Sequence, residues 1–492
     1  MSKDQAPYRQ IFKSTSLFGG AQVFIILISI IRSKFIALLI GPLGIGIVGL
    51  LNSTLTFITA LTNFGLERSS VKNIAAANSS GNTTRIGLVV AVLRRLVWIT
   101  GILGALITFF FSTFLSELTF GNNDYNWAFM LLSVTLLLNQ ISAGQGVVLR
   151  GMHQLKYLAK SSLLGATSGL IISVPIYYIW GLNGIVPAII ISSVLSLFLT
   201  FYYSRKVYID SVKVSRRDLF SEGKDMMSMG IMLSLSSLLV LGESYLIRIY
   251  IRLIGSIEDV GFYAAGFAIV NTYFGVIFTA LTTDYYPKLA GIVNDNKKAI
   301  LLMNQQSEMT VLIISPLLVA FLVFINVIVV ILYSQEFLPI SEMILWAGLG
   351  IFFKAASWAL GVIFISNGDV KTLFWSEFSA TSVMFVLNLL GYKYLGLEGL
   401  GVSFFIAYIY AYIQTFLIVK FKYSFYYSRE FYKIYIFHLV LGTIGFLIVK
   451  INEEPMNYYL GIVVILISFG YSIIELDKRI DLKGIIKKYK GS

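Results

Sequence analysis

Long apolar runs separated by short polar segments follow one another along the whole chain. A helix of about 20 mainly apolar residues crosses the hydrocarbon core of a bilayer. The pattern therefore predicts an all-α, polytopic membrane protein with about 14 transmembrane helices. The predicted spans are 14–40, 45–66, 96–116, 127–149, 161–180, 184–203, 227–254, 260–283, 309–333, 343–365, 372–391, 399–419, 434–449 and 457–474.

The composition supports a membrane protein and excludes several kinds of catalytic and metal site. Of the 492 residues, 57% are hydrophobic and 13% are charged, about half the charge of a soluble domain. The chain has no cysteine and two histidines, which excludes disulfides and thiolate catalysis and argues against a metal site. It also has no phosphate-binding loop, nucleophile elbow or paired-carboxylate glycosidase motif. We therefore expect neither catalytic residues nor a resident cofactor, and predict that the protein is not an enzyme.

The net charge of +13 raises the question of a nucleic-acid partner, which the placement of the charges answers. With both termini on the cytoplasmic side, cytoplasmic segments hold 31 of the 38 Lys and Arg residues. The outer loops hold only Lys393 and Lys450, and the other five cations lie within spans. This asymmetry is the positive-inside rule. It predicts cytoplasmic termini with no nucleic acid involved. The basic segments then act as simple topology determinants, and contact with anionic phospholipid headgroups is the alternative.

Four loops of the first half resemble four loops of the second half at a spacing of about 215 residues. "LLIGPLGIGIV" resembles "RLIGSIEDVGFY", which pairs Gly41 with Gly255. "WGLNGIV" resembles "LGLEGLG", which pairs Gly184 with Gly399. Six helices separate the copies, so both have the same orientation, and we expect two six-helix lobes related by an axis along the membrane normal. The predicted domains are an N-lobe (1–204), a cytoplasmic linker (205–226), a C-lobe (227–420), and two extra helices with a basic tail (421–492).

Charged residues inside the spans are the candidate functional residues, because a charge in hydrocarbon costs at least ~2.5–3.5 kcal/mol. The cations outnumber the acids, so mutual pairing cannot neutralise them. The surplus must face a hydrated cavity and suits a phosphate or pyrophosphate, which arginine binds through two donors at once. The five cations are Arg32, Lys34, Arg248, Arg252 and Lys354, and the two acids are Glu243 and Glu377.

The five cations differ in how strongly their positions favour substrate binding. Arg32 precedes Gly41 by nine residues, roughly 13 Å of helix, which is too deep for easy snorkelling. Arg248 and Lys354 are also deep within their spans. Lys34 lies some 200° around the helix from Arg32, so a structural role is equally open for it. Arg252 is close enough to the outer surface to snorkel.

Acidic residues raise the question of ion coupling. Glu243 is the deepest acid of its helix. A buried carboxylate takes up protons readily, but Glu243 can equally form a salt bridge with a span cation. Glu377 and Asp284 have a weaker case, since Asp284 sits at the cytoplasmic end of its helix. Coupling to a proton or sodium gradient therefore stays open.

Several segments resemble the Wzx-type flippases of O-antigen and enterobacterial common antigen units, within the multidrug/oligosaccharidyl-lipid/polysaccharide exporter superfamily. They include "GPLGIGIVGLLNSTLTFITALTNFG", "EDVGFYAAGFAIVNTYFGVIFTALTTDYYPKL" and "SQEFLPISEMILWAGLGIFFKAASWALGVIFISNGDVKTLFWSE". The likeness covers about residues 10–420. Arg32 occupies the place of an arginine in the first helix of the related lipid II flippases. Lys354 and Glu377 sit where the common-antigen flippases carry Lys and Glu.

The resemblance implies a carrier of undecaprenyl-pyrophosphate-linked oligosaccharide in lipopolysaccharide or other polysaccharide biosynthesis. Such a carrier works by alternating access in the bacterial inner membrane and moves its substrate from the cytoplasmic to the periplasmic leaflet. A glycan polymerase and a chain-length regulator are the partners that the resemblance suggests.

Two other functions compete with this interpretation. A drug antiporter of the same superfamily would favour cationic substrates and an acidic cavity, which the surplus of cations opposes. A polymerase or ligase acting on the same lipid-linked glycan would need a large periplasmic loop for its catalytic groups. The outer loops here are short, roughly 5–12 residues by our boundaries.

The charge asymmetry predicts the side of the membrane on which the chain ends. A reporter that is active only in the cytoplasm, fused after Ser492, should be active. A periplasmic reporter at the same place should be silent. The opposite pattern would overturn the count of fourteen spans.

Overall fold

The computed structural model describes residues 5–212 and 214–480, with the side chains of 5–21, 233 and 480 left out. Most of the predicted basic C-terminal tail lies outside these residues. The described chain is helical, with fifteen α-helices and two short 3₁₀ turns, and it contains no strand. The all-α prediction is therefore confirmed.

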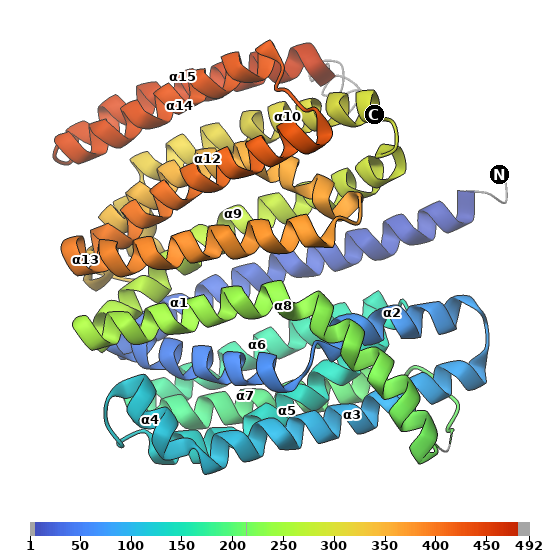
Figure 1. Ribbon diagram of the computed structural model, residues 1–492. Helices are drawn as coiled ribbons and strands as arrows, with labels where there is room; N and C mark the ends of the chain where they lie inside the picture. The colour runs from blue at the N-terminus through green and yellow to red at the C-terminus, as the bar shows by residue number, and fades with distance from the viewer. Residues whose placement is uncertain (1–4, 213, 481–492) are drawn as a thin grey trace. The chain divides into compact units, whose positions relative to one another are not determined.

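The helices follow one another in the order of the predicted spans (Figure 1). They are α1 (Gln5–Thr62), α2 (Leu66–Ser79), α3 (Thr83–Phe110), α4 (Ser112–Phe120), α5 (Asn126–Gly151), α6 (Leu155–Trp180), η1 (Gly181–Gly184), α7 (Ile185–Ser204), α8 (Arg216–Ile254), α9 (Ile257–Ile292), α10 (Asn296–Val323), α11 (Ile325–Leu332), η2 (Gln335–Phe337), α12 (Ile340–Ser366), α13 (Val370–Tyr423), α14 (Arg429–Ile451) and α15 (Met456–Ile480).

Ten helical segments of the described chain are long and apolar enough to cross a membrane, and α8, bent by 54°, is an eleventh. Three of them, 41, 50 and 54 residues long, each hold two of the predicted spans. A bilayer needs only about 20 residues per crossing. The segments therefore correspond to the fourteen predicted spans.

Glycine breaks the long helices where the sequence predicts turns. At Gly41, φ is 61° and ψ is −169°, values that a residue with a Cβ rarely adopts. Pro42 follows, and α1 reverses direction there (Figure 1). In α13 the break is at Gly396, and Ser403 Oγ donates to the Leu387 carbonyl oxygen at 2.6 Å across the two halves. The short loops are thus tight hairpin turns between antiparallel helices.

Backbone geometry supports the predicted repeat at its second pair of loops. Gly181 has φ 53° and ψ −129°, and Gly396 has φ 59° and ψ −138°. A Cβ on Gly184 would press on the Ile176 carbonyl oxygen, and one on Gly399 would press on that of Gly391. Each glycine therefore packs against the residue eight positions before it.

The first pair of loops meets in a reciprocal contact. A Cβ on Gly46 would clash with the carbonyl oxygen of Ile257, and a Cβ on Gly261 would clash with that of Pro42. Reciprocal contacts of this kind are typical of two segments related by a local two-fold axis. The predicted partner of Gly41 behaves differently, because Gly255 has φ −113° and ends α8. There Ser256 and Asp259 cap the next helix, so the turn needs no left-handed residue.

The described chain divides into two compact units, one running to Gly261 with 332–334 and the other holding the remainder from Phe262. Helix α8 therefore belongs to the first unit by its contacts, and the predicted domain bounds stay a prediction. The reason lies in its packing on α1, α2 and α3. A Cβ on Gly65 would clash with the Gly230 carbonyl oxygen, so the two backbones touch where α2 crosses α8. The relation of two six-helix lobes by one axis stays a prediction.

In the second unit, α14 and α15 pack on α10 and on each other. His438 of α14 is buried, with its ring nitrogens 3.1 Å from Ser468 Oγ and 3.0 Å from Ser472 Oγ. It is a packing residue whose polar atoms are satisfied. At one end of these helices, Arg479 pairs with Glu308 of α10 at 3.0 Å.

The reciprocal glycine contact predicts a sharp difference between two glycines of α9. Gly261→Ala should destabilise the protein by about 1–3 kcal/mol, because the added Cβ forces the α1 backbone away. Gly275→Ala should be neutral or stabilising, since nothing lies within 4 Å of its Cβ position. The measurement is the thermal unfolding midpoint of the detergent-solubilised variants. Equal midpoints for both variants would contradict the close crossing.

Candidate functional site

A cavity of about 240 Å³ lies between the second half of α1 and the middle of α8. Its α1 residues follow the spacing i, i+3, i+4, i+7, and its α8 residues follow i, i+3, i+7, so each helix contributes one face. Arg248 is the charged residue in its lining. The lining residues are Gly49, Asn52, Ser53, Thr56, Leu241, Ser244 and Arg248.

Two of these side chains have hydrogen-bonding groups without a partner. Asn52 and Thr56 are exposed, and neither side chain forms a hydrogen bond within the described chain. Ser53 differs, since its Oγ donates to the Leu50 carbonyl oxygen at 3.0 Å. A carboxamide left without a hydrogen bond in hydrocarbon costs about 2–7 kcal/mol. This face of α1 is therefore built for water or for a polar ligand.

Arg248 brings positive charge to this polar face. It is half-buried, and its Nη1 donates to the Ser244 carbonyl oxygen at 2.7 Å and to Ser244 Oγ. Arg248 lies seven residues before Gly255, roughly 10 Å of helix. The cavity thus joins a deep cation to neutral hydrogen-bonding side chains, and such a combination suits an anion carrying hydroxyl groups.

A second cavity of about 180 Å³ adjoins the first, and Leu241 lines both. It lies between the end of α1, the start of α2 and α8, and it is also polar. Arg68 Nη2 donates to Ser237 Oγ at 2.8 Å, and Glu67 lies 3.6 Å from Arg150. Asn63 and Ser234 add further hydrogen-bonding groups. The α1–α8 face is therefore polar from Gly49 to Arg68.

Arg32 lies on the first half of α1 and lines neither cavity. It is half-buried against α6, where its Nη1 is 3.4 Å from the position of a Cβ on Gly169. Its guanidinium interacts with Tyr177, while its buried Nε has no hydrogen-bond partner in the described chain. The absence of a side chain at Gly169 makes room for the guanidinium. One donor of this deep arginine is thus left unsatisfied.

Arg252 forms hydrogen bonds with the end of a neighbouring helix. Its Nε donates to the Thr119 carbonyl oxygen at 3.0 Å, and its Nη2 donates to that of Leu118 at 2.8 Å. These carbonyls end α4, where helices have unsatisfied acceptors and favour a cation. Arg252 therefore caps α4, and this role accounts for its charge without a substrate.

Lys354 belongs to α12 in the second unit. Its Nζ lies 5.1 Å from the ring centre of Tyr408 and 5.5 Å from that of Phe278. Two aromatic faces thus hold a half-buried ammonium by cation–π attraction. No ion pair joins Lys354 to Glu377, which is half-buried on α13, in the part of the chain that the structure describes.

The remaining predicted residues lie outside the two cavities. Lys34 is half-buried on α1, and Glu243 is half-buried on α8. Asp284 is exposed on α9 and pairs with Lys288 at 2.5 Å. Exposed pairs one helical turn apart are common surface features. Of the predicted cations, the structure brings Arg248 into a polar cavity.

The sequence analysis did not identify Asn52, Thr56 and Ser244 as site residues. A signal for them exists, because Asn52, Thr56 and Asn63 follow a helical spacing on an otherwise apolar span. Neutral polar residues are less costly than charges in a membrane helix, so their pattern stands out less. Only the facing serines of α8 reveal that these side chains line one surface.

The family profile "Polysaccharide biosynthesis protein" matches residues 11–293, which is more than half of the chain. The chain belongs to this family. The matched region includes α1, α8 and both cavities between them. No curated protein sequence matches the chain at a significant level.

Several solved membrane transporters share the fold. A lipid II flippase, MurJ, in an inward closed conformation has a TM-score of 0.69 at 14% identity, over 94% of this chain and 99% of that chain. An inward-facing multidrug resistance MATE transporter of the MOP superfamily has a TM-score of 0.65 at 17% identity, over 81% and 94%. A MOP superfamily transporter from Pyrococcus furiosus has a TM-score of 0.59 at 15% identity, over 84% of this chain and 96% of that chain. At these identities the likeness establishes the fold, and the proteins that share it are carriers rather than enzymes.

The polar α1–α8 face predicts water access inside the membrane. The natural chain has no cysteine, so single cysteines can be labelled without background. Asn52→Cys and Thr56→Cys should react with a water-soluble maleimide in intact membranes. Leu246→Cys, exposed on a different side of α8, should react much more slowly because it faces lipid. Labelling of all three at one rate would show that the face is not selectively hydrated.

Proposed function

We propose that this protein is a flippase that moves an undecaprenyl-pyrophosphate-linked oligosaccharide from the cytoplasmic to the periplasmic leaflet of a bacterial inner membrane. The observation that carries the proposal is the cavity beside Arg248, where a deep cation lies among neutral hydrogen-bonding side chains. A pyrophosphate needs the cation, and the attached sugars need donors and acceptors. Membership of a polysaccharide biosynthesis family supports a glycan as the cargo.

The fold supports a carrier for such a lipid. MurJ, which shares the fold, is a lipid II flippase, so this helix arrangement is known to carry a lipid-linked cargo. In our proposal Arg248 and Arg32 contact the pyrophosphate, and Lys354 stays a predicted substrate-binding residue. Asn52, Thr56 and Ser244 hydrogen-bond sugar hydroxyls. The buried and partnerless Nε of Arg32 is consistent with a group reserved for a ligand.

The proposal also covers the membrane, the energy source and the partners. The surplus of Lys and Arg in alternate loops supports cytoplasmic termini. Coupling to an ion gradient through Glu243 or Glu377 is part of the proposal, and Asp284 is left out because its exposed pair with Lys288 satisfies it. A glycan polymerase and a chain-length regulator would act on the product at the periplasmic face.

Export of the glycan should depend on two arginines in different helices. Charge-assisted hydrogen bonds contribute about 1.5–3 kcal/mol each, so losing one should weaken substrate binding roughly 10- to 150-fold. Arg32→Ala and Arg248→Ala should therefore abolish export at normal expression levels. Arg32→Lys should restore it in part, because a point charge cannot bind two phosphate oxygens in the manner of a guanidinium. The measurement is glycan export in a flippase-null strain, with membrane levels quantified.

Arg217→Ala is the matched control, since it removes one positive charge from an exposed position of α8 and should leave export intact. Full export by well-expressed Arg32→Ala and Arg248→Ala variants would make these arginines structural and refute the proposed site. Resistance of the same strain to cationic dyes tests the antiporter alternative. Dye efflux that requires Arg248 would favour it over the flippase.

A further inference from the structure

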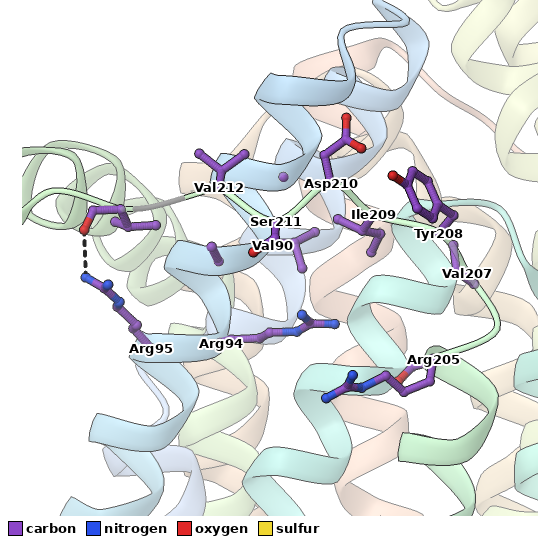
Figure 2. Close-up of a pocket in the computed structure, with 14 residues that line it drawn as sticks. Val90, Arg94, Arg95, Arg205, Val207, Tyr208, Ile209, Asp210, Ser211 and Val212 are labelled. Atoms are coloured by element: carbon purple, nitrogen blue, oxygen red, sulfur yellow. Dashed lines mark hydrogen bonds between the residues drawn. The ribbon is translucent and has the colours of Figure 1, made fainter.

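A third cavity, of about 530 Å³, lies at the end of the first unit away from the Arg248 cavity. It is formed by the first half of α3, the end of α7 and the segment 205–212 that leaves α7. Its volume falls in the range of about 300–1,000 Å³ that small-molecule sites occupy. Figure 2 shows this segment crossing above α3.

Three arginines line this cavity, which we call the basic pocket. Arg94 and Arg205 extend toward each other from α3 and from the end of α7 (Figure 2). Their charges repel each other, and neither has an ion-pair partner among the described residues. Arg95 points the other way and donates to the Val214 carbonyl oxygen at 3.0 Å. Two guanidinium groups thus share one cavity, and neither forms an ion pair in the part of the chain that the structure describes.

The acid nearest to these arginines in the sequence does not neutralise them. Asp210 belongs to the pocket lining, but its carboxylate points away from Arg94 and Arg205 (Figure 2). It forms no ion pair in the described chain. An external anion between the two guanidiniums would therefore remove a repulsion that the protein leaves in place.

The pocket is held by packing rather than by a loose loop. A Cβ on Gly87 would lie 2.5 Å from the Asp210 carbonyl oxygen, so the segment rests directly on α3. Val214 is buried in the core formed with Val90 and Leu93. On the α7 side, Ser204 Oγ donates to Gln145 Oε1 at 2.7 Å. Both ends of the segment are therefore fixed, and the arginines are placed before any ligand arrives.

The position of the pocket indicates which anion it meets. Arg94 and Arg205 lie just outside the predicted spans 96–116 and 184–203, and these bounds predict a position near the lipid headgroups. Tyr208, 87% exposed on the crossing segment, is a residue typical of that level. Basic pockets at the cytoplasmic ends of membrane helices suit anionic headgroups. A lipid phosphate is thus the anion present at the highest local concentration.

We propose that the basic pocket is a phosphate-binding site, separate from the transport cavity, in which Arg94 and Arg205 hold the phosphate of an anionic lipid headgroup. This inference does not depend on the cargo that the protein carries. The same two arginines would also accept free phosphate or pyrophosphate, so the experiment must separate the two sources.

Native mass spectrometry of the full-length, detergent-solubilised protein tests the proposal. The protein is titrated with phosphatidylglycerol, with phosphatidylcholine of the same acyl chains, and with inorganic pyrophosphate. We expect one retained phosphatidylglycerol, with affinity reduced at least about tenfold by Arg94→Gln or Arg205→Gln. Lys206→Gln is the matched control. It removes the same charge one residue away, from a side chain that lies over Tyr202 and outside the pocket.

The outcomes separate clearly. Selective loss of phosphatidylglycerol in the Arg94 and Arg205 variants supports a lipid headgroup site. Pyrophosphate binding with the same dependence supports a site for soluble phosphate. Equal loss in Lys206→Gln, or no dependence on either arginine, overturns the proposal. Arg205→Gln lies in the crossing segment, so it provides the test even where Arg94→Gln disturbs α3. Unfolding midpoints of all variants serve as the folding control.

Discussion

Backbone hydrogen bonding is the constraint on which the rest of this structure depends. Inside a bilayer every N–H and C=O must be satisfied within the protein, so the chain crosses as helices and turns only briefly between them. Glycine makes those turns possible. At Gly41 and Gly396 it adopts a conformation that other residues avoid, and at Gly46 and Gly261 it lets two backbones touch. The first unit owes the packing of α1 against the start of α9 to this contact.

Polar side chains inside a membrane-spanning helix cost free energy unless they meet water or a polar partner. Their location therefore indicates where such a partner binds. On the α1–α8 face, Asn52 and Thr56 lie beside Arg248 and form no side-chain hydrogen bond with the described residues. Other charged groups of the spans contact the protein itself. Arg252 caps α4, and Lys354 lies between two aromatic rings. Our proposal assigns substrate binding to this face, because polar groups in a span are costly unless they have a function.

The two basic regions of the first unit differ in physical character. Arg248 lies on the polar α1–α8 face, among neutral hydrogen-bonding side chains and well inside its predicted span. Arg94 and Arg205 sit at the edge of the spans, in a cavity floored by packed helices. In the two proposals, the basic pocket holds a lipid phosphate and the Arg248 cavity contacts the cargo. No residue lines both cavities, so the two proposed sites do not share a side chain.

The sequence by itself determined the fold class, the number of spans and the turn positions, because hydrocarbon imposes length and apolarity on every crossing. It also determined the local repeat, since glycines at matched positions adopt matched geometry at Gly181 and Gly396. Only the tertiary structure decided which charged side chains contact a neighbouring helix and which face a cavity. Arg252 and Arg248 are four residues apart on one helix, yet one meets the end of α4 and the other meets a cavity. That difference depends on which neighbouring helix lies opposite each side chain, and spacing along a single helix carries no such information.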